Sequence, residues 1–173
     1  MHNAIAAANY ETRHALYQSF QMNETLEREL NHISDSADRR IDAAAERVLR
    51  YLLMCNEFQL RDKVSGTSGY AGEFSEKRIK DSKGRSLRDL DLKTRLFRYP
   101  CSYLIYGAAF DALPDQVRTR IDTGLLDILE GRNQSPTYGH LDMAMRREIL
   151  EILKDTKPGL WHSSISENLG DSR

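Results

Sequence analysis

The chain has 173 residues, of which 40% are hydrophobic and 29% are charged, and its formal net charge at pH 7 is −1. These values are typical of one soluble globular domain and exclude an intrinsically disordered chain. The longest apolar stretches, around residues 48–54 and 103–110, are far shorter than the roughly 20 apolar residues that a membrane-spanning helix needs.

The amino terminus has neither the basic start nor the uninterrupted apolar segment of a secretory signal. It begins directly inside a helical pattern, with His2 and Asn3 as the available caps. From this start we expect the chain to be part of a longer protein. The composition leaves the compartment open between the cytoplasm and the periplasm.

Helix-favouring residues run from residue 3 to residue 32, with apolar side chains at three- and four-residue steps. This pattern predicts one long helix or two abutting helices. The apolar stripe continues through Leu26 and Leu30 but shifts near residues 21–23, where we expect a bend or a change of packing partner.

A second helix is predicted over residues 37–56, with Ser34 and Ser36 as candidate caps at its start. One of its faces is apolar and the other is charged, so it should pack antiparallel to the first helix. The apolar face consists of Ile41, Ala44, Val48, Leu52 and Cys55.

Residues 57–85 are rich in glycine and serine and predict an ordered connector, with one short helix over residues 71–79. Ser86 is the predicted cap of a helix over residues 87–99, and Asp89 completes a pattern close to a capping box. Pro100 should end that helix, because the residue before a proline disfavours helical backbone angles.

A shorter helix is predicted over residues 101–113. Pro114 suits the first turn of the next helix, which Gly131 should stop. Asp142 is the predicted cap of a last helix that runs through Lys154.

The predicted fold class is all-α, because no segment shows a strand pattern. We expect a single irregular bundle of roughly five to seven helices. The bundle should occupy residues 1–160, with its connector at residues 57–85, and a flexible polar tail should follow over residues 161–173.

Basic residues concentrate in residues 77–98, which hold nine lysines and arginines against three aspartates. We interpret this segment as the organiser of the connector. On a helix, Arg88 reaches Asp91 and Asp91 reaches Arg95, and partly buried pairs of this kind can form a network. The hydroxyls that we expect to join it belong to Tyr99, Tyr103 and Tyr106.

Cations and aromatic rings are mixed over residues 77–106, and this mixture also suits an anionic small ligand or single-stranded nucleic acid. Nucleic acid is the less favoured ligand because the chain as a whole is not basic. The residues predicted to bind a ligand or a partner are Arg85, Arg88, Asp91, Lys93, Arg95, Arg98, Tyr99 and Tyr103.

The chain has two cysteines, Cys55 and Cys101, both among apolar residues. Two buried free thiols are the favoured interpretation, and a disulfide between them stays open. Cys101 is also a weak catalytic candidate, because a helix start and the nearby Arg95 or Arg98 could lower its pKa. The sequence places no general base beside it.

Metal and phosphate motifs are incomplete. Glu29 and His32 have the spacing of a di-iron ligand pair, but no second copy of the motif occurs. Residues 66–72 are rich in glycine but lack the lysine of a phosphate-binding loop, so we expect a structural turn. The sequence therefore predicts no metal site and no cofactor.

The segment RSLRDLDLKTRLFRYPCSYLIY, preceded by GTSGYAGEF and followed by FDALP and ILEILKDTKPGL, resembles the carboxy-terminal region of a group of uncharacterised bacterial proteins. The similarity covers about residues 40–160. It implies a bacterial origin and a terminal position in a longer protein, some longer members being exported, but it implies no activity.

Three functional hypotheses follow. The favoured one is a non-enzymatic helical interaction or scaffold module that packs against another protein or domain through the surface around residues 85–106. The second is a binding domain for an anionic small ligand or nucleic acid at that surface. The third is an enzyme that uses Cys101. Salt-dependent binding and thiol alkylation distinguish the second and third from the first.

Overall fold

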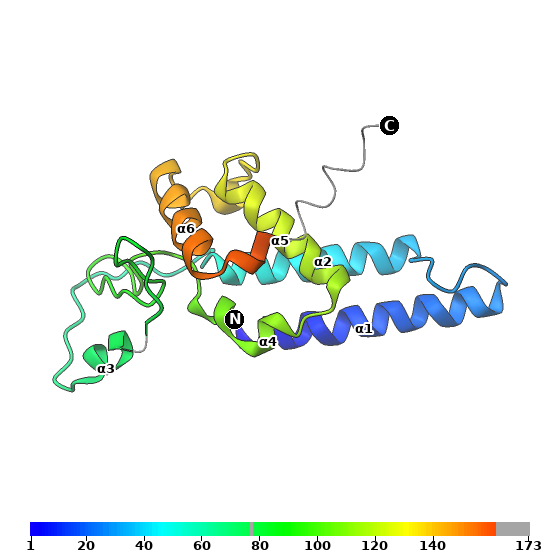
Figure 1. Cartoon of the computed structure of the whole chain (residues 1–173), viewed down its shortest axis with the longest axis horizontal. Helices are drawn as coiled ribbons and strands as arrows, with labels where there is room; N and C mark the ends of the chain where they lie inside the picture. Colours follow the sequence, from blue (N-terminus) through cyan, green and yellow to red (C-terminus); the bar gives the residue numbers. More distant parts are fainter. Residues whose placement is uncertain (77, 162–173) are drawn as a thin grey trace.

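The computed structural model describes residues 1–76 and 78–161 (Figure 1). These residues form six α-helices and three short 3-10 helices, and they contain no β-sheet. The predicted all-α fold is therefore confirmed. The predicted tail, residues 161–173, lies outside the described residues except for Trp161, which ends the 3-10 helix Pro158–Trp161.

Helices α1 (His2–Thr25) and α2 (Asp35–Leu52) form a long antiparallel hairpin (Figure 1). α2 buries the apolar face that its sequence pattern predicted, while Cys55 lies beyond its end and is half-buried. α1 presents small side chains to α2, which allow the two backbones to approach closely. The buried alanines of α1 are Ala4, Ala8 and Ala15.

The first helix ends at Thr25, so the prediction that helix continues to residue 32 is wrong. The chain turns at Glu27, whose φ of 51° is left-handed. Two buried polar side chains hold the turn closed, because Ser19 and Asn23 both donate to the carbonyl of His32, at 3.0 and 2.6 Å. These hydrogen bonds fix the geometry of the hairpin end.

The second helix begins at Asp35, two residues before the predicted start. Ser34 is its cap, as predicted, and its hydroxyl accepts the backbone N–H of Ala37 at 3.3 Å. It ends at Leu52, earlier than the predicted residue 56. Met54 and Asn56 have φ angles of 53° and 62°, which are incompatible with a continuing right-handed helix. The chain therefore turns sharply away at this point.

Helix α5 (Asp115–Leu129) packs against α2, and α6 (Met143–Thr156) packs against α5. Their boundaries agree with the predicted ones. Gly131 follows α5 with a φ of 80°, and the Asp142 carboxylate caps α6 by accepting the backbone N–H of Met145 at 2.8 Å. The core of the bundle is formed by α1, α2, α5 and α6 together with buried residues of the segment 87–113.

The connector extends further along the chain than predicted. Among the described residues, α3 (Tyr70–Glu76) is the one helix between α2 and Tyr103. α3 agrees with the short helix predicted over residues 71–79, within which residue 77 is not described. The helix predicted over residues 87–99 is wrong.

Ser86 and Asp89 do form the hydrogen bonds of a cap, but they close a turn. The backbone N–H of Ser86 donates to the Asp89 carboxylate at 2.9 Å, while the Asp89 carbonyl accepts the N–H of Arg98 at 2.8 Å. Leu90 and Phe97 then form an isolated antiparallel bridge. The predicted capping hydrogen bonds therefore form, but the antiparallel pairing of Leu90 with Phe97 takes the place of the predicted helix.

The turn between the bridge residues is closed by the Asp91 carboxylate, which accepts the backbone N–H groups of Thr94 and Arg95. The segment after α2 runs beside it, since the N–H of Leu60 donates to the Thr94 carbonyl at 3.0 Å. The connector is thus ordered by its own backbone hydrogen bonds, as a loop layer at one end of the bundle (Figure 1).

The helix predicted over residues 101–113 is divided in two. A 3-10 helix spans Tyr103–Tyr106 and α4 spans Ala108–Asp111. Gly107 separates them with an extended backbone (ψ of 144°), so the helical hydrogen bonds cannot continue.

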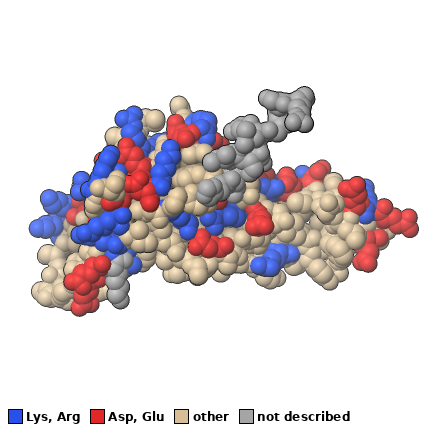
Figure 2. All heavy atoms as spheres, viewed as in Figure 1, with Lys and Arg blue, Asp and Glu red and all other residues tan. Residues whose placement is uncertain are grey.

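Charge is distributed unevenly along the long axis of the molecule. Figure 2 shows lysines and arginines gathered over the connector end and acidic side chains at the free end of the α1–α2 hairpin. No described helix combines the length and the apolar character that crossing a bilayer would demand.

Candidate functional site

Arg85 is engaged by acidic residues of the fold. Its guanidinium lies 2.7 Å from the Asp81 carboxylate and 2.8 Å from that of Glu151 on α6, which also pairs with Lys83 at 2.8 Å. Burial is the largest single effect and lowers the pKa of Arg85, but its hydrogen bonds to Asp81 and Glu151, together with their negative charges, outweigh burial and raise this pKa. These ion pairs hold the connector against α6.

Arg88 lies among aromatic rings. Its guanidinium carbon is 4.1 Å from the ring centroid of Phe74 on α3 and 4.6 Å from that of Tyr103. Phe97 packs against both rings, with centroid separations of 6.0 and 5.9 Å. We call Arg88, Phe74, Phe97 and Tyr103 the aromatic cluster. It holds α3 against the rest of the connector through cation–π and ring contacts.

The charged pairs predicted on a helix do not form. Asp91 accepts the backbone N–H groups of its own turn, and the hydrogen bonds from Thr94 lower the pKa of its carboxyl group. Arg88 contacts rings instead of Asp91. Of the hydroxyls predicted to join the network, that of Tyr106 pairs with Thr156 at 2.7 Å. The network was predicted for a helix that does not exist.

The remaining predicted residues divide between the core and the surface. Tyr99 is buried, and burial is the main cause that raises the pKa of its hydroxyl. Lys93 and Arg98 are exposed, with the Arg98 guanidinium 5.5 Å from the Tyr99 ring. The structure therefore brings Arg88 and Tyr103 together in the aromatic cluster but does not gather all of the predicted binding residues at one site.

Cys101 is fully buried, and this burial raises the pKa of its thiol to about 12. The expectation that a helix start and neighbouring arginines lower this pKa is therefore wrong. Both cysteines are free thiols, as the favoured interpretation expects, but Cys101 is buried whereas Cys55 is half-buried. A buried, protonated thiol is a poor nucleophile, because the thiolate is the reactive form.

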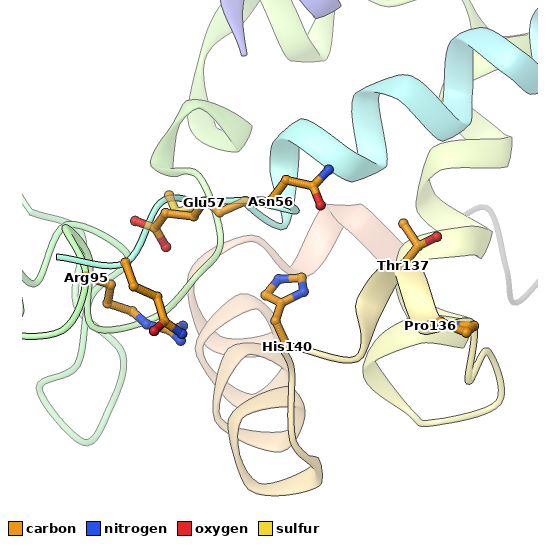
Figure 3. Close-up of a pocket in the computed structure, with 8 residues that line it drawn as sticks. Asn56, Glu57, Arg95, Pro136, Thr137 and His140 are labelled. Carbon is orange, nitrogen blue, oxygen red and sulfur yellow. The ribbon is translucent and has the colours of Figure 1, made fainter. Parts of the chain in front are cut away.

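Arg95 is the predicted binding residue that lines a pocket. The pocket has a volume of about 210 Å³ and lies where the end of α2, the turn at Arg95 and the loop before α6 meet (Figure 3). The residues labelled in Figure 3 are Asn56, Glu57, Arg95, Pro136, Thr137 and His140.

Hydrogen bonds between separate segments hold the walls of this pocket. The carbonyl of Leu53 can only accept, so the His140 ring donates to it through Nε2–H at 2.8 Å. In the neutral tautomer that donates through Nε2, Nδ1 is an acceptor. Glu57 accepts the backbone N–H of Leu96 at 3.3 Å, which joins the segment after α2 to the turn at Arg95.

Arg146 of α6 holds the loop that carries His140 through hydrogen bonds to its backbone. This arginine is 5% exposed, and its guanidinium donates to four backbone carbonyls at 2.7–3.1 Å. The acceptors are the carbonyls of Ile128, Asn133, Tyr138 and Leu141. Neither Arg146 nor His140 was singled out from the sequence, because both depend on contacts between separate segments.

Metal ligands do not gather in the part of the chain that the structure describes, where no group of three His, Cys, Asp or Glu side chains could hold an ion. Glu29 and His32 follow the end of α1, so they do not share a helical face. Comparisons of the chain with protein-family models, curated proteins and solved structures find no match.

Proposed function

We propose that the protein is a non-enzymatic helical interaction module that binds a basic amphipathic helix of another protein or domain. The observation that carries the proposal is the free end of the α1–α2 hairpin, which extends past α5 (Figure 1). Met22 and Leu26 of this end are 53% and 51% exposed, although they continue the face of α1 that buries Ala15.

The space beside these side chains is a groove of about 650 Å³ between the two helices. Met22 and Leu26 line it, together with Ala37 at the start of α2. Arg40 also lines the groove, but its guanidinium is already hydrogen-bonded within the hairpin. It donates to Gln18 Oε1 at 2.6 Å and lies 3.1 Å from Nδ1 of His14. A helix that places apolar residues at i, i+3, i+4 and i+7 in the groove would cover this exposed surface.

The charge of the hairpin end indicates the sign of the charge that the partner should carry. Its residues between 24 and 35 include four acidic side chains and one arginine, and Figure 2 shows the acidic groups at the surface. The acidic residues are Glu24, Glu27, Glu29 and Asp35. A helix with lysines or arginines flanking its apolar stripe would be complementary.

This proposal moves the docking surface away from the segment that the sequence favoured, residues 85–106. The ion pairs of Arg85 and the ring contacts of Arg88 support a structural role for that segment. The buried thiol of Cys101 supports the non-enzymatic part of the proposal.

The test uses a synthetic Leu/Lys peptide with leucines at i, i+3, i+4 and i+7, and a control peptide of the same composition in scrambled order. Fluorescence anisotropy measures binding of each labelled peptide. We expect the amphipathic peptide to bind more tightly, with an affinity that falls as salt increases, because exposed charges are screened.

Variant proteins locate the site. Met22→Ser with Leu26→Ser should weaken binding about 10-fold or more, because covering the exposed half of each side chain contributes roughly half of the ~1.5–3 kcal/mol of full burial. Phe58→Ser is the matched control, since Phe58 is an exposed apolar residue of the connector. Equal binding of the two peptides, or no loss in the double variant, would contradict the proposal.

A further inference from the structure

We infer that the pocket between Glu57, Arg95 and His140 binds a small zwitterion in which a carboxylate and an ammonium group lie close together, as in an α-amino acid. The pocket lies at the carboxyl end of α2, whereas the proposed docking groove lies at its amino end. The inference is therefore independent of the proposed interaction module.

Arg95 supplies the side of the pocket that would hold a carboxylate. Among the described residues its guanidinium has no ion-pair partner, and its hydrogen bond goes to the sulfur of Met145 at 3.5 Å. A half-buried guanidinium with its strongest donors unused is a binding group for a carboxylate, which can accept two parallel N–H bonds from it.

Glu57 and His140 supply the side that would hold an ammonium group. Within the described part of the chain Glu57 makes no ion pair and accepts a single backbone N–H, so its second oxygen is available. His140 donates to Leu53 through Nε2–H, and in this neutral tautomer its Nδ1 is an acceptor. Figure 3 shows His140 projecting into the space across from Glu57 and Arg95.

The balance of charge separates a zwitterion from a simple anion. Arg95 and Glu57 contribute opposite charges to the same pocket, so a phosphate would gain from Arg95 and be repelled by Glu57. A molecule with both charges satisfies both groups. The volume, about 210 Å³, lies below the roughly 300–1,000 Å³ of pockets for drug-sized ligands, so the ligand is small.

The backbone of the pocket turns through two left-handed residues directly after α2. Met54 and Asn56 both line the pocket, and both hold left-handed φ angles without being glycine. The turn at these two residues places Glu57 in the same pocket as Arg95, directly after the end of α2.

The test is an NMR titration of the protein with glycine, acetate, methylammonium and inorganic phosphate in separate experiments. The His140 ring and Arg95 Nε–H resonances report on the pocket. We expect glycine to shift both sets with saturation, and to bind about 10-fold more tightly than acetate or methylammonium, each of which satisfies one side only. The inference would be overturned if acetate or phosphate bound as tightly as glycine, or if glycine caused no saturable shift.

Two variants test the roles of the charges. Arg95→Gln should lose glycine and acetate binding alike. Glu57→Gln keeps an oxygen for the Leu96 N–H, so the turn should stay closed; it should weaken glycine binding about 10-fold and strengthen acetate binding. Arg98→Gln, which changes an exposed arginine outside the pocket, should leave both affinities unchanged. An unchanged preference for glycine in Glu57→Gln would refute the assignment.

Discussion

Replacing Arg146 with methionine removes the charged group that holds the loop between α5 and α6. In the native protein its guanidinium donates to the carbonyls of Ile128, Asn133, Tyr138 and Leu141. Methionine is similar in length and apolar, so it fills much of the same space while donating no hydrogen bond. The variant therefore isolates the contribution of the four hydrogen bonds.

The magnitude follows from opposing contributions. A hydrogen bond with a charged partner contributes roughly 1.5–3 kcal/mol, so four of them set an upper bound near 6–12 kcal/mol. Burying the cation itself costs several kcal/mol, and the loop can relax so that water reaches some of the carbonyls. We expect Arg146→Met to lower the free energy of unfolding by about 3–5 kcal/mol.

Urea unfolding followed by circular dichroism measures this change. With a denaturant slope of about 2 kcal/mol per molar, the midpoint should fall by about 2 M. Arg147→Met is the matched control, because Arg147 is the exposed neighbour on the same helix, and it should change stability by less than about 0.5 kcal/mol. A loss below about 1 kcal/mol in Arg146→Met, or equal losses in the two variants, would refute the reasoning.

Two further predictions concern a buried carboxyl group and the aromatic cluster. Burial raises the pKa of Asp122 to about 6 despite its ion pair with Arg118. The folded state therefore keeps a proton that the unfolded state loses, so the free energy of unfolding should fall as pH rises from about 4 to about 6. Asp122→Asn should flatten that part of the urea-midpoint profile, and identical profiles would contradict the assignment. Arg88→Met should accelerate hydrogen exchange in α3 and cost about 1–2 kcal/mol, whereas Arg98→Met should do neither; equal exchange in the two variants would count against the cluster.

The elements that the sequence predicted well are those with local start and stop signals. Ser34 and Asp142 cap α2 and α6 through backbone groups three residues away, and Gly131 ends α5 with its own left-handed φ. Periodic apolar residues then decide which face is buried. These determinants are contained within one helix and its flanks, so a linear pattern suffices to find them.

The helix predicted over residues 87–99 failed because long-range contacts override the local signal. The cap formed by Ser86 and Asp89 exists, but Leu87 and Tyr99 are buried in the core and Phe97 packs against Phe74. A bridged turn can place all of these side chains inward, whereas one face of a helix could not. Propensity is a weak determinant when tertiary packing opposes it.

The candidate pocket could be predicted only in part. Arg95 was named from the local charge pattern, whereas the partners that surround it come from the end of α2 and from the loop before α6. The partner of Arg85 on α6, Glu151, is similarly remote in sequence. No pattern within a single segment specifies which distant residues will meet, and the fold is needed to show it.

The pocket is formed by contacts that need no ligand, and this has a consequence for its affinity. The hydrogen bond of His140 to Leu53 and that of Leu96 to Glu57 exist in the free protein, and Arg146 fixes the loop between them and α6. Because the walls are already ordered, a ligand need not supply the free energy to order them. Loosening the loop through Arg146→Met should therefore weaken glycine binding as well as folding, although Arg146 touches no ligand, whereas Arg147→Met should preserve both.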